Sequence, residues 1–503
     1  MKKSILLFCA ASAVLAAFAK LEPATLFNDN MVLQRGRSVP VWGKADAGSE
    51  VTVSFAGQVV TAKAAADGRW RANLSALTAE AKGREFTIEE KGANGASDKV
   101  TYRNVVVGEV WLCGGQSNMT FAMWPANSVG KHAGRERNGY YDIALTDEPD
   151  VRGVHMPTCW AGEEKNHARL EWFDFTPDHD RGNFSAAAWH YAMRLNYSLK
   201  VPVGVIECAW GGSCIETWIP PFAYADSKSF KAFATKAIRT EPTEAERANQ
   251  KKTGRGPALH QQPRACWNAM VYPLAPFAIK GAIWYQGCTN RGRWKEYYEM
   301  LETLRAGWGR AFECGGDMPF FLCQITPYGY TSEAADNGET MIREEMERFG
   351  LSNGPNVGCA ICSDVGEIDN IHPGDKRTVA TRLAALALNR VYGFKKLKCD
   401  APVFEKATVS ADGAKITLSF RNVEGFNRNG EYPEQFELAG EDGKWTLVKA
   451  SYSAKGNTIT LDVPAGLKPV QLAYMRKSCV HGFIKNEAGL PLGPFRTGLS
   501  TVK

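Results

Sequence analysis

Between residues 106 and 398, apolar runs alternate with segments of helical periodicity, and this alternation limits the possible folds more than any other feature. The apolar runs are VVVGEVWLC, VGVIECAW, AIKGAIWYQG, PFFLCQI and VGCAICSDV. Among the segments between or after them, KRTVATRLAALALNRV places Val379, Leu383 and Leu386 at helical spacing. Nearly continuous apolar strands are typical of a parallel sheet covered on both faces. We therefore predict an α/β three-layer sandwich for this region.

Hairpin patterns flank this region on both sides. Short alternating runs such as VTVSF and a turn at Asp67-Gly68 occur before it, and KITLSF with a turn at Asp442-Gly443 occurs after it. A chain of 503 residues also exceeds what one hydrophobic core usually serves. We predict a signal peptide at 1–19, an N-terminal β-sandwich domain at 20–105, a central α/β domain at 106–398 and a C-terminal β-rich domain at 399–503.

The first nineteen residues, MKKSILLFCAASAVLAAFA, have a positive start, an apolar stretch and an Ala-x-Ala ending, which predicts a secretory signal cleaved before Lys20. The formal charge of +6 falls to +4 when Lys2 and Lys3 are removed. No long basic block is present, so nucleic acid and membrane surfaces are not expected partners. We expect a periplasmic or extracellular protein with no membrane anchor after cleavage, and the sequence indicates no oligomeric state.

Removal of Cys9 leaves twelve of the thirteen cysteines in a compartment that permits disulfides, and their spacing does not fix any pairing. Cys359 and Cys362 form a C-x-x-C within VGCAICSDV. This stretch is predicted to be a strand, in which positions three apart face opposite sides. A redox or zinc site is therefore not predicted there.

One of the eight histidines, His372, lies in DVGEIDNIHP, just beyond a predicted strand end. Asp369 precedes it by three residues, and such a carboxylate can hold an imidazole while the second ring nitrogen serves a nucleophile. An ordinary turn explains the same residues equally well. Asp364 and Glu367 share the loop, so the choice of Asp369 as the orienting carboxylate is a hypothesis.

Two serines compete for the role of nucleophile. Gly350-Leu351-Ser352-Asn353-Gly354 matches G-x-S-x-G, but it follows a helical segment and precedes a strand, whereas a nucleophile elbow requires strand, turn and helix in that order. Ser117 comes straight after VVVGEVWLC, with Gly114 and Gly115 allowing a sharp turn. A helix N-terminus at that place would offer N–H groups to an oxyanion. We therefore favour Ser117.

The stretches WLCGGQSNM, WYQGCTN and IHP together resemble the sialate O-acetylesterase family of the SGNH hydrolase superfamily. The resemblance extends from LFNDNMVLQRGRSVPVWGKA near the start to GLPLGPFRT near the end. It implies an SGNH-type, flavodoxin-like esterase domain with Ser117 as nucleophile and His372 and Asp369 as its partners. It also implies an oxyanion hole formed by Ser117, Gly212 and Asn290.

Two positions depart from this family pattern. Gly114 stands where members usually have Ser, and Cys288-Thr289 stand where they have Glu-Ser. No member of the triad is lost, but the fit of the substrate is affected. Gln116 and Gln286 are candidate substrate-binding residues, and bracing of the loop backbones is the alternative role for both.

The resemblance implies an exported enzyme that hydrolyses O-acetyl esters of sialic acids through a Ser-His-Asp acyl-enzyme mechanism, with no metal or organic cofactor. An acetylxylan or other polysaccharide acetylesterase is an alternative that would use the same residues. A non-catalytic glycan-binding protein is a third, and the intact set of site residues argues against it. The expected partner is an O-acetylated sialic acid or another acetylated glycan.

Overall fold

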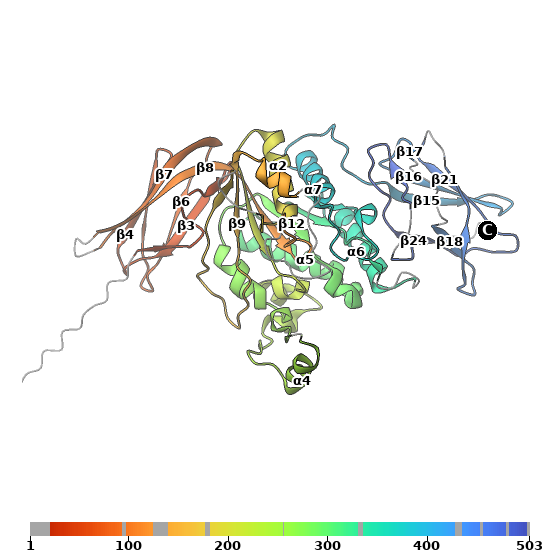
Figure 1. The fold of residues 1–503 in the computed structure, drawn as a ribbon, viewed down its shortest axis with the longest axis horizontal. Helices are drawn as coiled ribbons and strands as arrows, with labels where there is room; N and C mark the ends of the chain where they lie inside the picture. Colours follow the sequence, from red (N-terminus) through yellow and green to blue (C-terminus); the bar gives the residue numbers. More distant parts are fainter. Residues whose placement is uncertain are drawn as a thin grey trace, which may run out of the picture.

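The computed structural model describes residues 21–92, 97–123, 139–176, 182–254, 256–329, 335–427, 435–452, 456–478 and 482–499. The predicted signal peptide at 1–19 lies outside these residues. Strands of the N-terminal part and strands of the C-terminal part occupy the two ends of the long axis, with the α/β part between them (Figure 1). This arrangement confirms the predicted fold class.

The central sheet has the strand order β10-β9-β11-β8-β12-β13-β14. Its strands are β8 (Ser97–Gly115), β9 (Glu148–His155), β10 (Phe173–Phe175), β11 (Val203–Ala209), β12 (Gly281–Tyr285), β13 (Phe320–Cys323) and β14 (Val357–Ala360). Along this order pairing is parallel from β9 to β14 and antiparallel between β10 and β9. Because β11 lies on one side of β8 and β12 on the other, β8 is at the switch point of the sheet, where ligands of such folds bind beyond the carboxyl ends.

Helices cover both faces of this sheet. Consecutive residues of β8 enter different cores, since Leu112 packs in one core and Trp111 and Cys113 pack in the other. The first core holds the apolar faces of α5 (Trp294–Ala311) and α6 (Gly338–Ser352), and the second holds those of α2 (Ala186–Leu199) and α7 (Lys376–Arg390). Three of these helices begin at side-chain caps, which satisfy backbone N–H groups of the first turn. The caps are Ser185, Asn337 and Asp375.

The N-terminal strands share both a strand and a core with the central part. They are β1 (Glu22–Pro23), β2 (Val32–Gln34), β3 (Val39–Lys44), β4 (Glu50–Phe55), β5 (Gln58–Lys63), β6 (Arg69–Leu74) and β7 (Glu80–Lys91). The first half of β8 pairs with β7, and the second half pairs with β11 and β12. The boundary expected between residues 105 and 106 therefore falls inside one continuous strand. The core on the α5 side also continues into the N-terminal part.

The C-terminal part has its own hydrophobic core. Its strands are β15 (Val403–Val409), β16 (Lys415–Arg421), β17 (Phe426–Asn427), β18 (Phe436–Ala439), β19 (Trp445–Val448), β20 (Ala450–Tyr452), β21 (Thr458–Asp462), β22 (Gln471–Tyr474), β23 (Lys485–Asn486) and β24 (Phe495–Gly498). Polar contacts join it to the central part: Asn337 Nδ2 donates to Ser478 Oγ at 2.8 Å, and Arg496 Nε donates to Glu344 Oε1 at 2.7 Å. α6 and its cap therefore contribute to the docking of the two parts.

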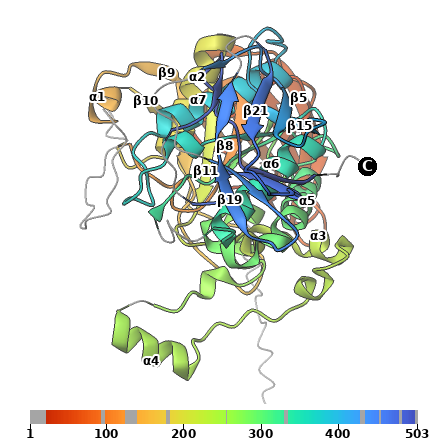
Figure 2. The same cartoon turned by 90° about the vertical axis from the view of Figure 1, so that its right-hand side faces the viewer.

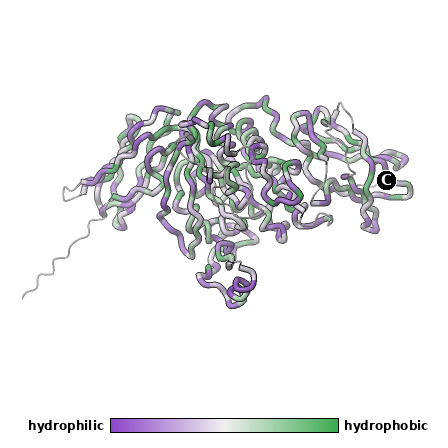
Figure 3. Tube along the Cα trace, in the orientation of Figure 1, coloured by the Kyte–Doolittle hydropathy of each residue, from purple (hydrophilic) through white to green (hydrophobic). Residues whose placement is uncertain are grey.

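One arm projects from the body. The chain leaves through α3 (Pro221–Asp226), forms α4 (Glu244–Thr253) and returns through the short helix η3 (Leu259–Gln261). No residue of α4 is buried, and Figures 2 and 3 show this helix standing away from the rest and largely hydrophilic. The remaining α-helix of the described chain is α1 (Gly139–Ala144). None of the helices in the described ranges has the length and apolar character needed to cross a bilayer.

Candidate active site

Ser117 lies in a tight turn directly after β8. Gly115 has φ +149°, and a Cβ on it would come within 2.2 Å of the Tyr285 carbonyl oxygen, so only glycine fits there. The N–H of Gln116 donates to that same carbonyl at 3.0 Å, and the N–H of Trp210 donates to the Gly115 carbonyl at 3.1 Å. The serine turn is thus fastened to the end of β12 and to the loop after β11.

The loop after β11 brings Gly211 and Gly212 beside the serine. A Cβ on Gly211 would lie 3.5 Å from the Cβ of Ser117, and Gly212 has φ +73°, a conformation that favours glycine. The Gly212 carbonyl accepts hydrogen bonds from Gln261 Nε2 at 2.7 Å and from Thr289 Oγ1 at 3.2 Å. The returning end of the arm and the loop after β12 therefore both hold this turn in place.

Asn290 is buried in η6 (Cys288–Arg293), the short helix after β12. Its Oδ1 accepts hydrogen bonds from the N–H of Ile215 at 3.0 Å and from Gln286 Nε2 at 2.8 Å. Its Nδ2 donates to Glu216 Oε2 at 2.8 Å, and the second carboxylate oxygen of Glu216 pairs with Arg293. An amide nitrogen carries two hydrogens, and among the described residues this arrangement orients Asn290 through one of them.

The histidine loop meets the serine turn through a direct hydrogen bond. Asn118 Nδ2 donates to the carbonyl of Ile371 at 3.0 Å, which joins the residue after Ser117 to the residue before His372. The backbone N–H of His372 donates to Asn370 Oδ1 at 3.0 Å. The structure therefore brings Ser117, Gly212, Asn290 and the His372 loop together beyond the carboxyl ends of the central strands.

The three carboxylates of the histidine loop have different partners. Asp364 accepts hydrogen bonds from Arg382 at 2.6 and 2.8 Å and pairs with Lys485 at 2.6 Å. Burial acts to raise the pKa of Asp364, but the hydrogen bonds from these cations outweigh it and lower the pKa. Glu367 accepts from Asn370 Nδ2 and from a backbone N–H, both at 3.0 Å. Asp369 is exposed and bonds no described residue, so its contact with His372 stays a prediction.

The two glutamines singled out in the sequence brace the loops. Gln116 Oε1 accepts from the N–H of Gly287 at 3.1 Å. Gln286 is fully buried, where its Nε2 donates to the Ser213 carbonyl at 3.1 Å and its Oε1 accepts from the Tyr297 hydroxyl at 2.8 Å. These contacts are those expected of the bracing role, and substrate contact by either residue stays a prediction.

Comparison with known proteins was made in sequence and in structure. No family model matches the chain. The sialate O-acetylesterases of Rattus norvegicus and Homo sapiens are each 27% identical to it, over 447 and 428 residues; both alignments cover 79% of this chain and 78% and 76% of those proteins. The crystal structure of a carbohydrate acetylesterase from Xanthomonas citri matches with a TM-score of 0.78 at 27% identity, covering 95% of this chain and 99% of that one. The chain is an esterase related to the sialate O-acetylesterases.

The structure explains the first of the two departures from the pattern of these esterases and describes the thiol at the second. A Cβ on Gly114 would come within 2.7 Å of Trp308 Cη2 and 3.0 Å of Trp284, so the indole rings occupy the space of a side chain there. Cys288 is partly exposed, and its burial against the core raises the pKa of its thiol to about 11, which keeps it protonated at neutral pH. Cys288 is therefore not a thiolate nucleophile beside the serine of this esterase.

The eleven cysteines in the described part of this esterase are free thiols. Cys359 packs against the core on the α5 side and Cys362 lies in the core on the opposite face. This agrees with the expectation that the C-x-x-C side chains point apart. Within the same described ranges, no group of three His, Cys, Asp or Glu residues is placed to hold a metal ion.

Sequence reasoning missed His260, which the arm of this esterase carries to the site. Its ring stacks on Trp210 with centroids 4.4 Å apart and 18° between the planes. Burial lowers the pKa of His260, and a hydrogen bond to the Gly211 backbone only partly offsets this, so the ring is neutral at neutral pH. No periodic pattern marks His260 in the polar stretch ALHQQPR, which is why the sequence did not single it out.

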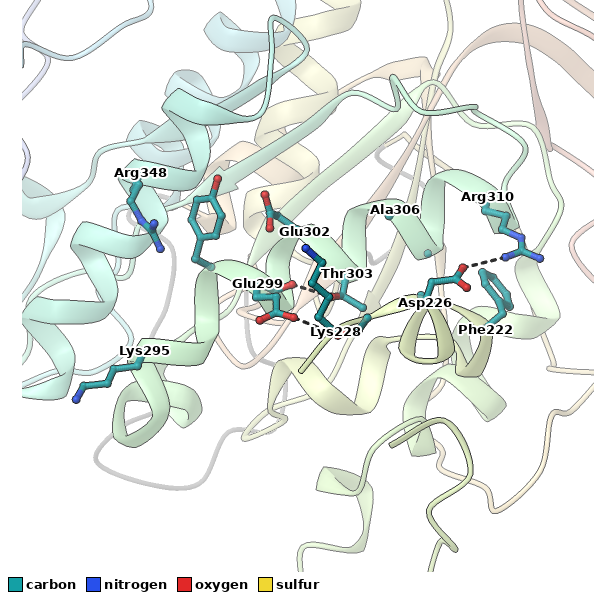
Figure 4. Close-up of a pocket in the computed structure, with 14 residues that line it drawn as sticks. Phe222, Asp226, Lys228, Lys295, Glu299, Glu302, Thr303, Ala306, Arg310 and Arg348 are labelled. Carbon is teal, nitrogen blue, oxygen red and sulfur yellow. Dashed lines mark hydrogen bonds and ion pairs between the residues drawn. The ribbon is translucent and has the colours of Figure 1, made fainter. Parts of the chain in front are cut away.

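A separate hollow of the esterase, with a volume of about 600 Å³, lies along α3 and α5 (Figure 4). Two of its carboxylates already have partners, since Asp226 pairs with Arg310 at 3.4 Å and Glu299 accepts from Ser229 Oγ at 2.6 Å. We call Ser117, Gly212, Asn290 and the His372 loop the Ser117 cluster. No residue that lines this hollow belongs to the Ser117 cluster, so the hollow is not part of the candidate active site.

Proposed function

We propose that the protein is an exported carbohydrate O-acetylesterase that hydrolyses O-acetyl esters of sialic acids through a serine acyl-enzyme. The observation that carries the proposal is the meeting of four loops at the carboxyl ends of the sheet. Ser117, Gly212, Asn290 and His372 come from these loops, and the Asn118–Ile371 hydrogen bond fixes the serine turn against the histidine loop. The relationship to the sialate O-acetylesterases supports the choice of substrate.

In the proposed cycle, Ser117 Oγ attacks the acetyl carbonyl carbon while His372 takes the hydroxyl proton. Asp369 orients the imidazole and stabilises its cation. The tetrahedral oxyanion accepts hydrogen bonds from the N–H groups of Ser117 and Gly212 and from the Asn290 amide, and each such donor is typically worth about 3 kcal/mol. His372 then gives its proton to the leaving sugar oxygen, which breaks the ester bond and leaves an acetyl-serine.

Water completes the cycle. His372 takes a proton from a water molecule as that water attacks the acetyl-serine, and the same oxyanion donors stabilise the second tetrahedral intermediate. The proton returns to Ser117 Oγ and acetate leaves. The buried contacts of Asn290 with Glu216 and Ile215 keep its amide in a fixed orientation for both steps, so little reorganisation is required.

The experiment measures acetate released from O-acetylated sialic acid and from acetylated xylan, side by side. Ser117→Ala tests the nucleophile, and Ser352→Ala is the matched control because Ser352 belongs to the misleading G-x-S-x-G and is exposed. We expect release from the sialic acid, abolished by Ser117→Ala and unchanged by Ser352→Ala.

Preference for xylan, with the same effect of Ser117→Ala, would keep the mechanism and assign the protein to acetylated polysaccharides. No release from either substrate by a folded protein would overturn the enzymatic proposal for these sugars. In that case binding of the intact acetylated glycan would be the result to look for, as expected of a non-catalytic protein.

A further inference from the structure

A second cavity of about 550 Å³ lies where the N-terminal strands meet the central part of the chain. Residues of β3, β5 and β6 form one wall, and the segment from Trp267 to Pro276 together with Phe222 of α3 forms the other. Its volume is within the range of sites that hold small organic ligands. None of its lining residues belongs to the Ser117 cluster.

Aromatic side chains give this cavity its walls. They are Trp42, Trp70, Phe222, Trp267 and Tyr272. Trp267 stands edge-on to Phe222 and Tyr272, at centroid distances of 6.0 and 6.2 Å, and its indole N–H is held by Glu164 at 3.0 Å. Trp42, Phe222 and Tyr272 are half-buried, and the guanidinium of Arg310 lies over the Phe222 ring at 4.6 Å. Partly exposed rings on a fixed frame are suited to pack against the C–H faces of a sugar ring.

Charged side chains surround the aromatic walls, and cations outnumber carboxylates. The cations are Lys44, Lys63, Arg69 and Arg71, and the carboxylates are Glu22 and Glu313. Arg71 and Glu313 neutralise each other through two hydrogen bonds of 2.6 and 2.7 Å. Lys63 is exposed and has no ion pair within the described chain. Arg69 pairs with Asp67 at 3.4 Å, and Glu50 of β4 is the register partner of Lys63. Lys63 therefore places a positive charge at the rim of the cavity, beside the aromatic rings.

We propose that this cavity is a second saccharide-binding site, separate from Ser117, and that it takes a sugar unit bearing a carboxylate. The rings of Trp42 and Tyr272 contact the apolar faces of the sugar, and Lys63 attracts its carboxylate. This proposal rests on the proposed function in one respect, namely that the natural substrates of the protein are glycans. A glycan held here would be retained at the protein surface between rounds of deacetylation.

The test is isothermal titration calorimetry on the full chain carrying Ser117→Ala, so that turnover is not needed for the readout. The probes are sialyllactose, a xylo-oligosaccharide substituted with glucuronic acid, and the same xylo-oligosaccharide without the acid. We expect at least one acidic probe to bind ten-fold or more tightly than the neutral one. Trp42→Ala should weaken its binding ten-fold or more, and Lys63→Gln should weaken it several-fold and reduce its salt dependence.

Tyr298→Ala, which alters the hollow of Figure 4 instead, is the matched control and should leave binding unchanged. Lys63→Gln changes an exposed side chain, so it remains informative if Trp42→Ala fails to fold. No binding of any probe, or binding that ignores both cavity variants, would overturn the site. Equal binding of neutral and acidic probes would overturn the carboxylate assignment. Failure of acetate release would leave these binding results unaffected, so the two proposals fail separately.

Discussion

Asn118 donates its side-chain amide to the backbone carbonyl of Ile371 at 3.0 Å, and this bond joins the turn of the proposed nucleophile to the loop of the proposed base. The two loops are 253 positions apart along the chain. A contact of this kind fixes the approach of a serine hydroxyl to an imidazole more directly than the packing of the strands beneath them.

Replacement of Asn118 by Ala should therefore reduce turnover. A small misplacement of reacting groups costs about 100-fold in rate, so we expect kcat on 4-nitrophenyl acetate to fall by about 10- to 100-fold with a modest change in KM. Asn389→Ala is the control, because Asn389 also bonds backbone carbonyls but is a half-buried residue in the last turn of α7. An unchanged kcat in Asn118→Ala would show that the bond does not position the catalytic loops.

Replacing Asp369 and replacing Asp364 in the histidine loop should have different effects, the first on activity and the second on stability. Asp369→Asn is expected to lower kcat strongly with little change in melting temperature, because the exposed carboxylate supports no described contact. Asp364→Asn should instead lower the free energy of unfolding by about 3 kcal/mol, the usual cost of breaking a buried ion pair, since Arg382 and Lys485 would lose their partner. Chemical denaturation and steady-state kinetics on both variants check this. Loss of kcat without loss of stability in Asp364→Asn would move the orienting role from Asp369 to Asp364.

Gly114→Ser restores the residue usual in the related family, yet it should destabilise this protein. The added side chain would collide with Trp308 and Trp284, and overpacking of this kind costs about 1 to 3 kcal/mol. Gly162→Ala is the comparison, because a Cβ there would meet no atom within 4 Å. Thermal unfolding of both variants measures the difference. Equal melting temperatures would mean that the indole rings can move aside.

Stability should fall as the pH rises toward 8, owing to Glu347 on α6. Burial, and then the charge of Glu344, raises the pKa of Glu347 to about 8, above its ordinary value of 4.5. The folded state therefore favours the protonated form, so the stabilisation is complete below pH 4.5 and is lost progressively up to about pH 8. Melting temperatures between pH 5 and 8 should decline less steeply in Glu347→Gln than in the unchanged protein. Parallel curves for the two proteins would contradict this assignment.

The sequence predicted the three layers because helices leave a periodic apolar pattern, as in α7, and doubly covered strands leave a continuous apolar run, as in β11. It also pointed to Ser117 and His372, since each follows a recognisable strand end. Glu216, Arg293 and His260 lie in short 3-10 helices within the long connections of the chain. No local sequence pattern indicates that the chain will bring them to Asn290 and Gly211. Their contacts arise from tertiary packing alone.

The domain boundary predicted between residues 105 and 106 shows a second reason why a sequence pattern does not determine the structure. The residues of β8 change from alternating burial at 97–103 to complete burial at 105–115. That change was interpreted as the start of a new domain. It marks instead the point at which a single strand passes from a sheet with one solvated face into a sheet covered on both faces.

Because β8 pairs with N-terminal strands in its first half and with central strands in its second half, it also sets the order in which these strands can pair as the chain emerges. Its amino-terminal half can pair with β7 as soon as both strands have emerged, whereas its carboxyl-terminal half waits for β11 and β12, the latter ending at residue 285. The emerging chain therefore carries the strand that precedes Ser117, the proposed nucleophile, with an open edge until more than half of the protein has emerged. An intermediate of this kind exposes unpaired backbone N–H and C=O groups together with apolar side chains, and it is the stage at which a chaperone would have the most to protect.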